Sequence, residues 1–269
     1  MAATPQTVEE LARPVADAGG WTAAVRNFVR RRPLGAVGAA IILVMAVLAA
    51  TANLIAPFDP LATDYGAMLS APGRDHWLGT VFGALIGVAS AYFGGRVDLV
   101  VQRVMDVFFA FPVIILALAV VAILGTGAEN VILAIAVPMV PRCARVVRSS
   151  ALSVREMPYV DAARASGYGH GRIILRHMLP NVMAPILIMS TAFLGEAILL
   201  EASLSFLGLG VQEPTAAWGL MLRGAAVEFA ETAPWMAVFP GLAISMAVFG
   251  FNLFGDSLRD ALDPRLRTQ

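Results

Sequence analysis

Lysine is absent from this sequence of 269 residues, and all 19 of its basic residues are arginine. The chain therefore contains no P-loop lysine, no Schiff-base lysine and no lysine general base. Cys143 is the only cysteine, which excludes an intrachain disulfide and a cysteine-based zinc cluster. Charged residues make up only 14% and the net charge is zero, so no basic field indicates nucleic acid as a partner.

Apolar residues take the place of the missing charges. Hydrophobic residues reach 58%, against about 45–50% in soluble domains, and the mean hydropathy is +0.75. A soluble globule could not bury that much apolar surface, and a disordered chain would be far more polar. The composition predicts an all-α integral membrane protein, because lipid leaves backbone groups no partner outside the helix.

Six apolar segments predict about six transmembrane helices. A spanning helix needs about 20 mostly apolar residues, within a range of roughly 17–25. The segments are 34–56, 77–93, 107–124, 130–141, 178–195 and 232–255. The second segment is marginal in length, and the fourth is so short that we expect its helix to continue into the arginines that follow.

Those arginines, Arg142, Arg145 and Arg148, recur every three residues and so lie near one helical face. We expect them to extend to the lipid headgroups as an interfacial anchor. The alternative is a binding site for an anionic group inside the membrane.

The distribution of arginine predicts the orientation. Positive residues collect in short cytoplasmic loops. With six spans and a cytoplasmic N-terminus, 17 of the 19 arginines lie in the cytoplasm and only Arg74 and Arg223 lie outside. Residues 1–33 then form a cytoplasmic tail, and the C-terminus is cytoplasmic as well.

One long cytoplasmic loop, residues 149–180, is polar and rich in arginine and glycine. Within it, Val160, Ala163 and Gly167 follow helical spacing and form a face of small residues, and Ala162 adds little bulk. The loop therefore predicts two short helices along the membrane that present small residues to a cytoplasmic partner.

The same loop resembles the EAA loop of ABC-importer permeases. The matching pattern is Asp161-Ala162-Ala163-x3-Gly167-x9-His177-x-Leu179-Pro180. The resemblance implies that these residues dock onto an ATP-binding subunit and couple ATP hydrolysis to transport. Asp161 stands where glutamate is usual, which keeps the charge and shortens its reach by one methylene.

Three further stretches resemble the C-type permease subunit of dipeptide, oligopeptide and nickel importers. They are Arg32-Pro33-Leu34 with residues 56–60, residues 201–210 with Trp218-Gly219, and residues 252–265. The resemblance implies a type I ABC importer (MetI-like) transmembrane domain over residues 77–269, preceded by an additional helix and extracytoplasmic loop over residues 34–76.

That resemblance also implies the function. The chain would be a multi-pass permease of the bacterial inner membrane that imports di- or oligopeptides, nickel or another small solute. It would pair with a second permease subunit, ATP-binding subunits and an extracytoplasmic binding protein. ATP and Mg²⁺ would bind to the partner subunits, so this chain would hold no cofactor and would not itself be an enzyme.

The sequence departs from the family pattern at Thr80–Val81, where several tens of residues are missing. The segment 77–93 is short for that reason. A transport-defective or regulatory paralogue is therefore the alternative to an active permease.

Two acids are candidates for the lining or gate of the pathway, since charges inside a membrane are costly. For Glu196 a pathway role and a position at the end of the fifth span are equally favoured. Glu201 is expected to begin an outside loop. The three histidines are too dispersed to predict a metal site.

Overall fold

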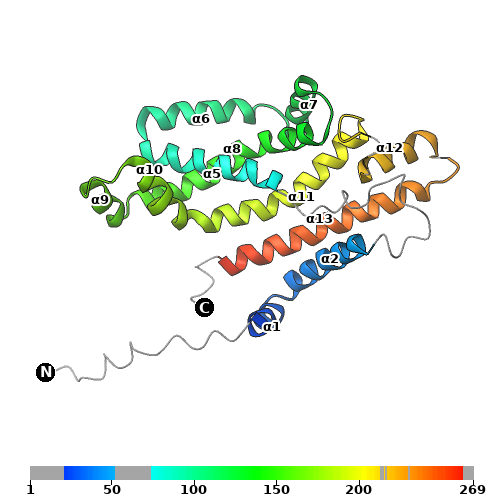
Figure 1. Cartoon of the computed structure of the whole chain (residues 1–269), viewed down its shortest axis with the longest axis horizontal. Coiled ribbons are helices and arrows are strands. Elements are labelled where there is room, and N and C mark those ends of the chain that lie inside the picture. The colour runs from blue at the N-terminus through cyan, green and yellow to red at the C-terminus, as the bar shows by residue number, and fades with distance from the viewer. Residues whose placement is uncertain (1–20, 52–73, 213–214, 216, 230, 263–269) are drawn as a thin grey trace.

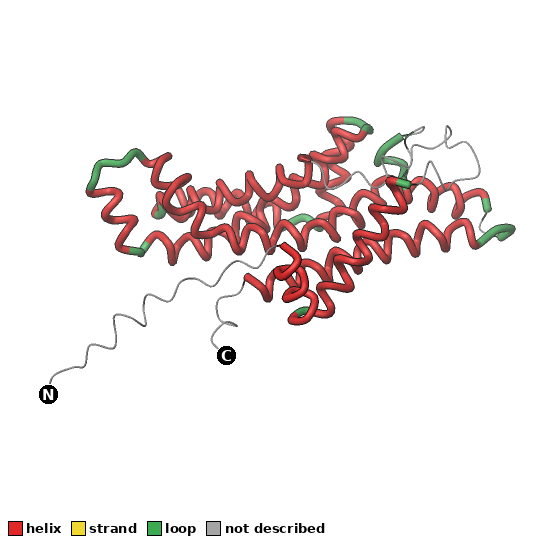
Figure 2. The backbone as a smooth tube through the Cα atoms, turned by 60° about the horizontal axis from the view of Figure 1, so that its bottom comes forward, coloured by secondary structure: helices red, strands yellow, loops and turns green. Residues whose placement is uncertain are grey.

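A computed structural model describes residues 21–51, 74–212, 215, 217–229 and 231–262. Every regular element within these ranges is helical, which confirms the all-α prediction. Most of the predicted N-terminal tail and of the loop after the first span lie outside the described residues. The long helices run side by side in an elongated bundle (Figures 1 and 2).

The elements follow one another along the chain as a series of long and short helices. They are α1 (Trp21–Arg31), α2 (Pro33–Ala50), α5 (Arg74–Phe93), α6 (Gly95–Phe109), α7 (Val113–Leu124), α8 (Ala128–Arg155), α9 (Pro158–Ala165), α10 (His170–Arg172), the π-helical η3 (Ile173–Met178), the 3₁₀ turn η4 (Leu179–Val182), α11 (Met183–Phe206), α12 (Trp218–Glu228) and α13 (Trp235–Leu262).

Among the described residues, four helical stretches are long and apolar enough to cross a membrane. They are Pro33–Ala50, Ala128–Arg155, His170–Phe206 and Trp235–Ala261. The pair α6 and α7 adds a fifth if the two count as one broken span, and α5 contributes a shorter apolar helix, Gly79–Phe93. As predicted, the fourth helix continues through the arginines to Arg155.

The predicted span over 107–124 is not one continuous helix. The chain bends by 92° between α6 and α7. Pro112 stands at the break, with a ψ of 138° that is not helical. Proline has no N–H to continue the hydrogen-bond ladder, and it disfavours helical geometry at the preceding residue, Phe111.

Helices α5 and α8 meet along a seam of glycines. Gly79, Gly83 and Gly87 are spaced one turn apart on the α5 face that touches α8. A Cβ atom on Gly83 would lie 2.6 Å from the Cβ of Cys143, and one on Gly87 would lie 2.5 Å from the carbonyl oxygen of Ala144. Only glycine allows this approach, which is the packing expected of a small-xxx-small motif in a membrane.

The junction Thr80–Val81 lies inside α5, and the helix is continuous across it. Thr80 is buried there. The shortened second span is therefore built into the packed bundle and is not looped out of it.

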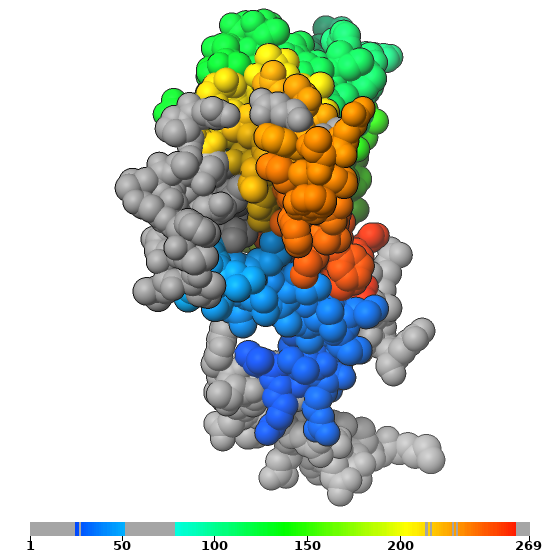
Figure 3. Space-filling model, turned by 90° about the vertical axis from the view of Figure 1, so that its right-hand side faces the viewer, coloured from blue at the N-terminus to red at the C-terminus, as the bar shows by residue number. Residues whose placement is uncertain are grey.

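Helix α2 packs along α13 at the side of the bundle. A Cβ on Gly38 would lie 2.7 Å from the carbonyl oxygen of Gly250. At the end of the contact, Arg32 pairs with the carboxylate of Asp260 at 3.0 Å and donates to its backbone carbonyl at 2.8 Å. In the space-filling view α1 and α2 (blue) project from the flank of the molecule (Figure 3). The start of the first long helix and the end of the last one thus share one end of the bundle.

Candidate functional site

The predicted coupling loop, 149–180, reaches the end of the bundle opposite to α12 and carries the short helix α9 (Figure 1). Val160 and Ala163 of α9 are buried. Asp161 and Ala162 are exposed. Helix α9 therefore rests on the bundle through its apolar side and presents an acid and a small residue outward.

Gly167 ends this helix in a left-handed turn, with a φ of +74°. The N–H of Tyr168 donates to the carbonyl of Ala163 at 3.2 Å, and the N–H of Gly167 donates to the carbonyl of Arg164 at 2.9 Å. These two bonds define a Schellman cap, which favours glycine at this position. Nothing lies within 4 Å of where a Cβ would stand on Gly167, so this turn faces open space.

His177, Leu179 and Pro180 lie after the turn, in η3 and η4. The ring of His177 stacks on Tyr168 with 5.7 Å between centroids, and its carbonyl accepts a hydrogen bond from Asn181 at 2.7 Å. His177 and Leu179 are half-buried, while Pro180 is exposed. The outward surface therefore comes from α9 and its cap, and His177 belongs to its support. The coupling role of all these residues stays a prediction.

The loop is tied to the end of α5 by contacts that sequence reasoning missed. The hydroxyl of Tyr92 and Nδ1 of His170 are hydrogen-bonded at 2.7 Å. Arg155 donates to the carbonyl of Ala91 at 3.1 Å, and the guanidinium of Arg164 lies 5.1 Å from the centre of the Tyr92 ring. The one sequence feature that could have indicated these contacts is Tyr92, a tyrosine at the end of an otherwise apolar helix.

Replacing Tyr92 by phenylalanine should loosen this attachment. The substitution removes only the hydroxyl, and the lost bond to His170 is worth about 0.5–1.5 kcal/mol. We expect faster hydrogen exchange of the backbone over residues 158–178, measured by mass spectrometry, with unchanged exchange in α12. Equal exchange in the variant and the natural protein would contradict a holding role for this hydrogen bond.

Three arginines of α8 pair with carboxylates on neighbouring helices. The pairs are Arg142–Glu196, Arg145–Asp106 and Arg148–Asp98, each with one N–O distance of 2.6 Å. Glu196 belongs to α11, and the two aspartates belong to α6. The expectation of an interfacial anchor is therefore wrong, since these guanidinium groups end on protein carboxylates.

The fifth span does not end at Gly195, because α11 runs to Phe206. Glu201 consequently lies inside the helix, where its carboxylate accepts a hydrogen bond from Ser205 at 2.6 Å. The prediction that Glu201 begins an outside loop is wrong. Both acids are tolerated in the span because each has a polar partner, Arg142 for Glu196 and Ser205 for Glu201.

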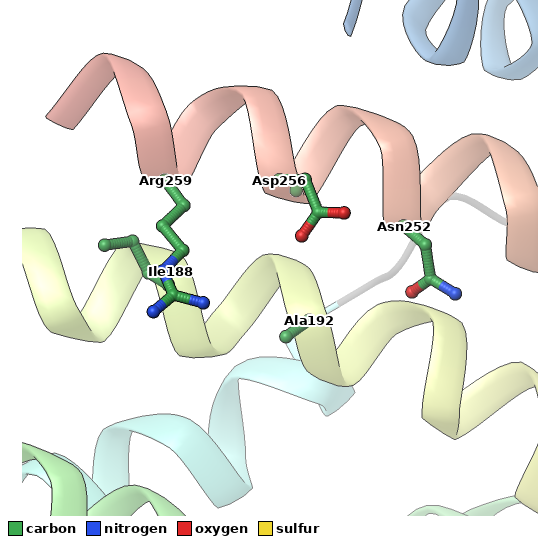
Figure 4. Close-up of a pocket in the computed structure, with 6 residues that line it drawn as sticks. Ile188, Ala192, Asn252, Asp256 and Arg259 are labelled. Carbon is green, nitrogen blue, oxygen red and sulfur yellow. The ribbon is translucent and has the colours of Figure 1, made fainter. Parts of the chain in front are cut away.

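Two grooves flank α11. The larger, of about 440 Å³, is lined by Phe109, Arg142, Arg145, Val146, Met189, Ala192, Phe193 and Glu196. The smaller, of about 260 Å³, lies between α11 and α13 and is lined by Ile188, Ala192, Asn252, Gly255, Asp256 and Arg259 (Figure 4). Ala192 borders both.

No group of three His, Cys, Asp or Glu residues is placed to hold a metal ion in the part of the chain that the structure describes. The side chain of His76 lies outside that part. The polar chemistry seen in the described bundle is thus ion pairing and hydrogen bonding.

Comparisons with known proteins agree with this architecture. Residues 79–268 match the family described as binding-protein-dependent transport system inner membrane component. Residues 21–72 match the N-terminal transmembrane domain of oligopeptide transport permease C.

Individual relatives are similar over nearly the whole chain. The dipeptide transport system permease protein of Alkalihalophilus pseudofirmus is 37% identical, with 92% of this chain and 91% of the relative aligned. A putative peptide transport system permease of Brucella suis is 39% identical, over 91% and 92%. A glutathione transport system permease of Escherichia coli is 38% identical, over 92% and 91%.

The lengths of these alignments bear on the missing segment. The alignment with the dipeptide permease has 278 positions but uses 92% of this chain of 269 residues, so about 30 positions of the relative have no counterpart here. This agrees with the expected deletion of several tens of residues. Its location at Thr80–Val81 stays a prediction.

Proposed function

Since this chain belongs to the family of binding-protein-dependent transport system inner membrane components, we propose that it forms part of the translocation pathway for di- or oligopeptides. The observation that carries the substrate class is that all three relatives above are described as permeases for dipeptide, peptide or glutathione. Uptake of a radiolabelled dipeptide by the reconstituted complex tests it. Uptake of only non-peptide solutes would overturn it.

The alternative of a transport-defective or regulatory paralogue has no support from these relatives, none of which is described in that way. Helix α5 is continuous across Thr80–Val81, although its apolar part, Gly79–Phe93, is shorter than the other spans. The option of nickel is not favoured by any of the three names.

The partners and orientation form the second part of the proposal. ATP hydrolysis takes place on separate subunits that bind the outward surface of α9, and a second permease completes the pathway. A binding protein delivers the substrate at the other end, near α12. The ion pair of Arg32 with Asp260 joins the start of α2 to the end of α13, and we assign that end of both helices to the cytoplasmic side, with α9.

The coupling surface consists of Asp161, Ala162 and the turn at Gly167. Ala163 is also part of the sequence pattern, but it lies on the buried side of α9. A substitution at Ala163 would therefore disturb the fold, whereas one at exposed Ala162 tests docking alone.

Ala162→Glu is expected to reduce ATP-driven peptide uptake about tenfold or more, because an unpaired charge buried in an interface costs several kcal/mol. Co-purification with the ATPase subunits should fall in parallel. The matched control is Ala226→Glu, the same change at an exposed alanine of α12 at the far end of the bundle. The comparison rests on co-purification, because α12 lies at the end where the binding protein is proposed to act. Equal co-purification of the ATPase subunits with the two variants would overturn the coupling assignment.

A further inference from the structure

The two grooves beside α11 are parts of one surface. One lies between α8 and α11 and the other between α11 and α13, and the exposed residue Ala192 borders both. The surface therefore lies near the middle of α8 and α11 and extends to the last turns of α13, where Asp256 and Arg259 lie.

This surface is polar, although it lies on helices that are long and apolar enough to cross a membrane. Its charged and amide groups are Arg142, Arg145, Glu196, Asn252, Asp256 and Arg259. Figure 4 shows Asn252 and Asp256 directed from α13 toward α11, with Arg259 extended across to Ile188. Charged groups in spanning helices face protein or a water-filled cavity, because contact with lipid is costly.

Another exposed face of the same bundle has the opposite character. On α2 the exposed side chains include Leu43, Val44, Val47 and Leu48, and no acid or base occurs between Pro33 and Ala50. That face suits lipid. The contrast indicates that the surface across α11 is turned away from lipid.

The ion pair of Arg142 with Glu196, in the larger groove, is only partly buried. The side chains of Arg142 and Glu196 remain 40% and 31% exposed while they are paired. Both also line the larger groove, whose volume of about 440 Å³ lies in the range of about 300–1,000 Å³ typical of small-molecule sites.

We propose that this surface is a water-lined binding face for zwitterionic peptides, in which Arg142 binds the peptide carboxylate and Glu196 binds its ammonium group. The proposal rests on the proposed peptide substrate and assigns the residues that contact it. A zwitterion can replace each member of the ion pair with a group of the same charge, so neither Arg142 nor Glu196 is left unpaired. Charge-assisted hydrogen bonds of this kind are the strong ones.

The first test measures access of water to the surface. The single native cysteine, Cys143, is fully buried, so Cys143→Ser provides a background without reactive thiols. Ala192→Cys in the full complex should react with a cationic methanethiosulfonate at least about tenfold faster than Leu43→Cys, because the thiolate forms readily only in a hydrated site. Equal rates, or no reaction at Ala192→Cys, would overturn the proposal.

The second test identifies the ligand groups. The dipeptide Ala-Ala should protect Ala192→Cys from the reagent, and the same peptide with acetylated and amidated ends should not. Adding Glu196→Gln should weaken protection about tenfold or more, the effect of losing a charge-assisted hydrogen bond. Glu196→Asp keeps the charge and should retain most protection, which separates ligand binding from a purely structural ion pair.

These tests distinguish failure of the proposed binding site from failure of the proposed peptide import. Equal protection by the free and the blocked dipeptide, or unchanged protection in Glu196→Gln, would overturn the binding site even if peptide uptake is normal. Protection without any ATP-driven peptide uptake would instead overturn peptide import while supporting the site.

Discussion

Replacing Gly83 by leucine is expected to prevent the bundle from forming. A Cβ on Gly83 would lie 2.6 Å from the Cβ of Cys143 and 2.7 Å from the carbonyl oxygen of Val140. Overpacking a core usually costs about 1–3 kcal/mol, and then only because side chains can move aside. Here a backbone carbonyl stands in the way, so α5 and α8 would have to separate and expose the core that they share.

The measurement is the yield of a monodisperse peak in size-exclusion chromatography after expression and detergent extraction. The matched control is Gly241→Leu, since Gly241 lies within helix α13 and nothing stands within 4 Å of where its Cβ would be. Gly241→Leu should behave like the natural protein. If Gly83→Leu gives the same yield as its control, the close seam between α5 and α8 is wrong.

The second large effect is expected at the ion pair of Arg148 with Asp98. These side chains are only 27% and 16% exposed, and Ser90 also donates to the Asp98 carboxylate. Arg148→Ala would leave that carboxylate in the bundle without its counter-ion. Removing one partner of a fully buried pair costs about 3–5 kcal/mol. Since this pair is partly exposed, we expect a smaller cost and a measurable drop in the thermal unfolding midpoint in detergent.

The comparison variant is Arg103→Ala, which removes an arginine that is 77% exposed and 3.8 Å from Asp106. An exposed pair of this kind is worth at most about 1 kcal/mol, so the midpoint should barely move. Adding Asp98→Ala to Arg148→Ala should recover part of the lost stability. Equal shifts of the unfolding midpoint in Arg148→Ala and Arg103→Ala would show that the burial of Arg148 adds nothing to the stability of the protein.

Hydropathy and charge were sufficient to predict the class of the protein and most of its helices. The length requirement for a spanning helix predicted that the fourth helix continues through Arg142, Arg145 and Arg148, and α8 does so. The spacing of small residues also predicted the short helix α9, but the prediction that Val160 and Ala163 face a partner is wrong, because both are buried against the bundle and Gly167 lies in the turn after the helix. The helices themselves depend on local sequence, which a single chain displays directly.

The wrong predictions concern residues whose contact partners lie far away in the sequence. A charge ordinarily ends a span, so the local sequence predicts a loop at Glu201. Arg142 was expected to reach headgroups, although its partner Glu196 lies 54 residues further along the chain. The helix ends and the ion pairs therefore depend on the packing of α6, α8 and α11, which no local pattern contains.

The coupling residues were predicted as a set, and the structure separates them by position. Asp161, Ala162 and Gly167 lie on the outside of the loop, whereas Ala163 and His177 support it from beneath. The attachment of the loop through Tyr92 could not be predicted, because its partner His170 is 78 residues away.

The glycine seam also determines how the bundle can transmit force. Helices α5 and α8 are in backbone contact over three successive turns, Arg155 of α8 donates to Ala91 of α5, and the hydrogen bond between Tyr92 and His170 joins the end of α5 to the loop that carries α9. Arg142 lies thirteen residues before Arg155 on α8, about 20 Å along the helix axis, and faces Glu196 on α11. A displacement of α9 would therefore move α5 and α8 together. Because Arg142 of α8 pairs with Glu196 of α11, such a movement would also change the contact between these two side chains.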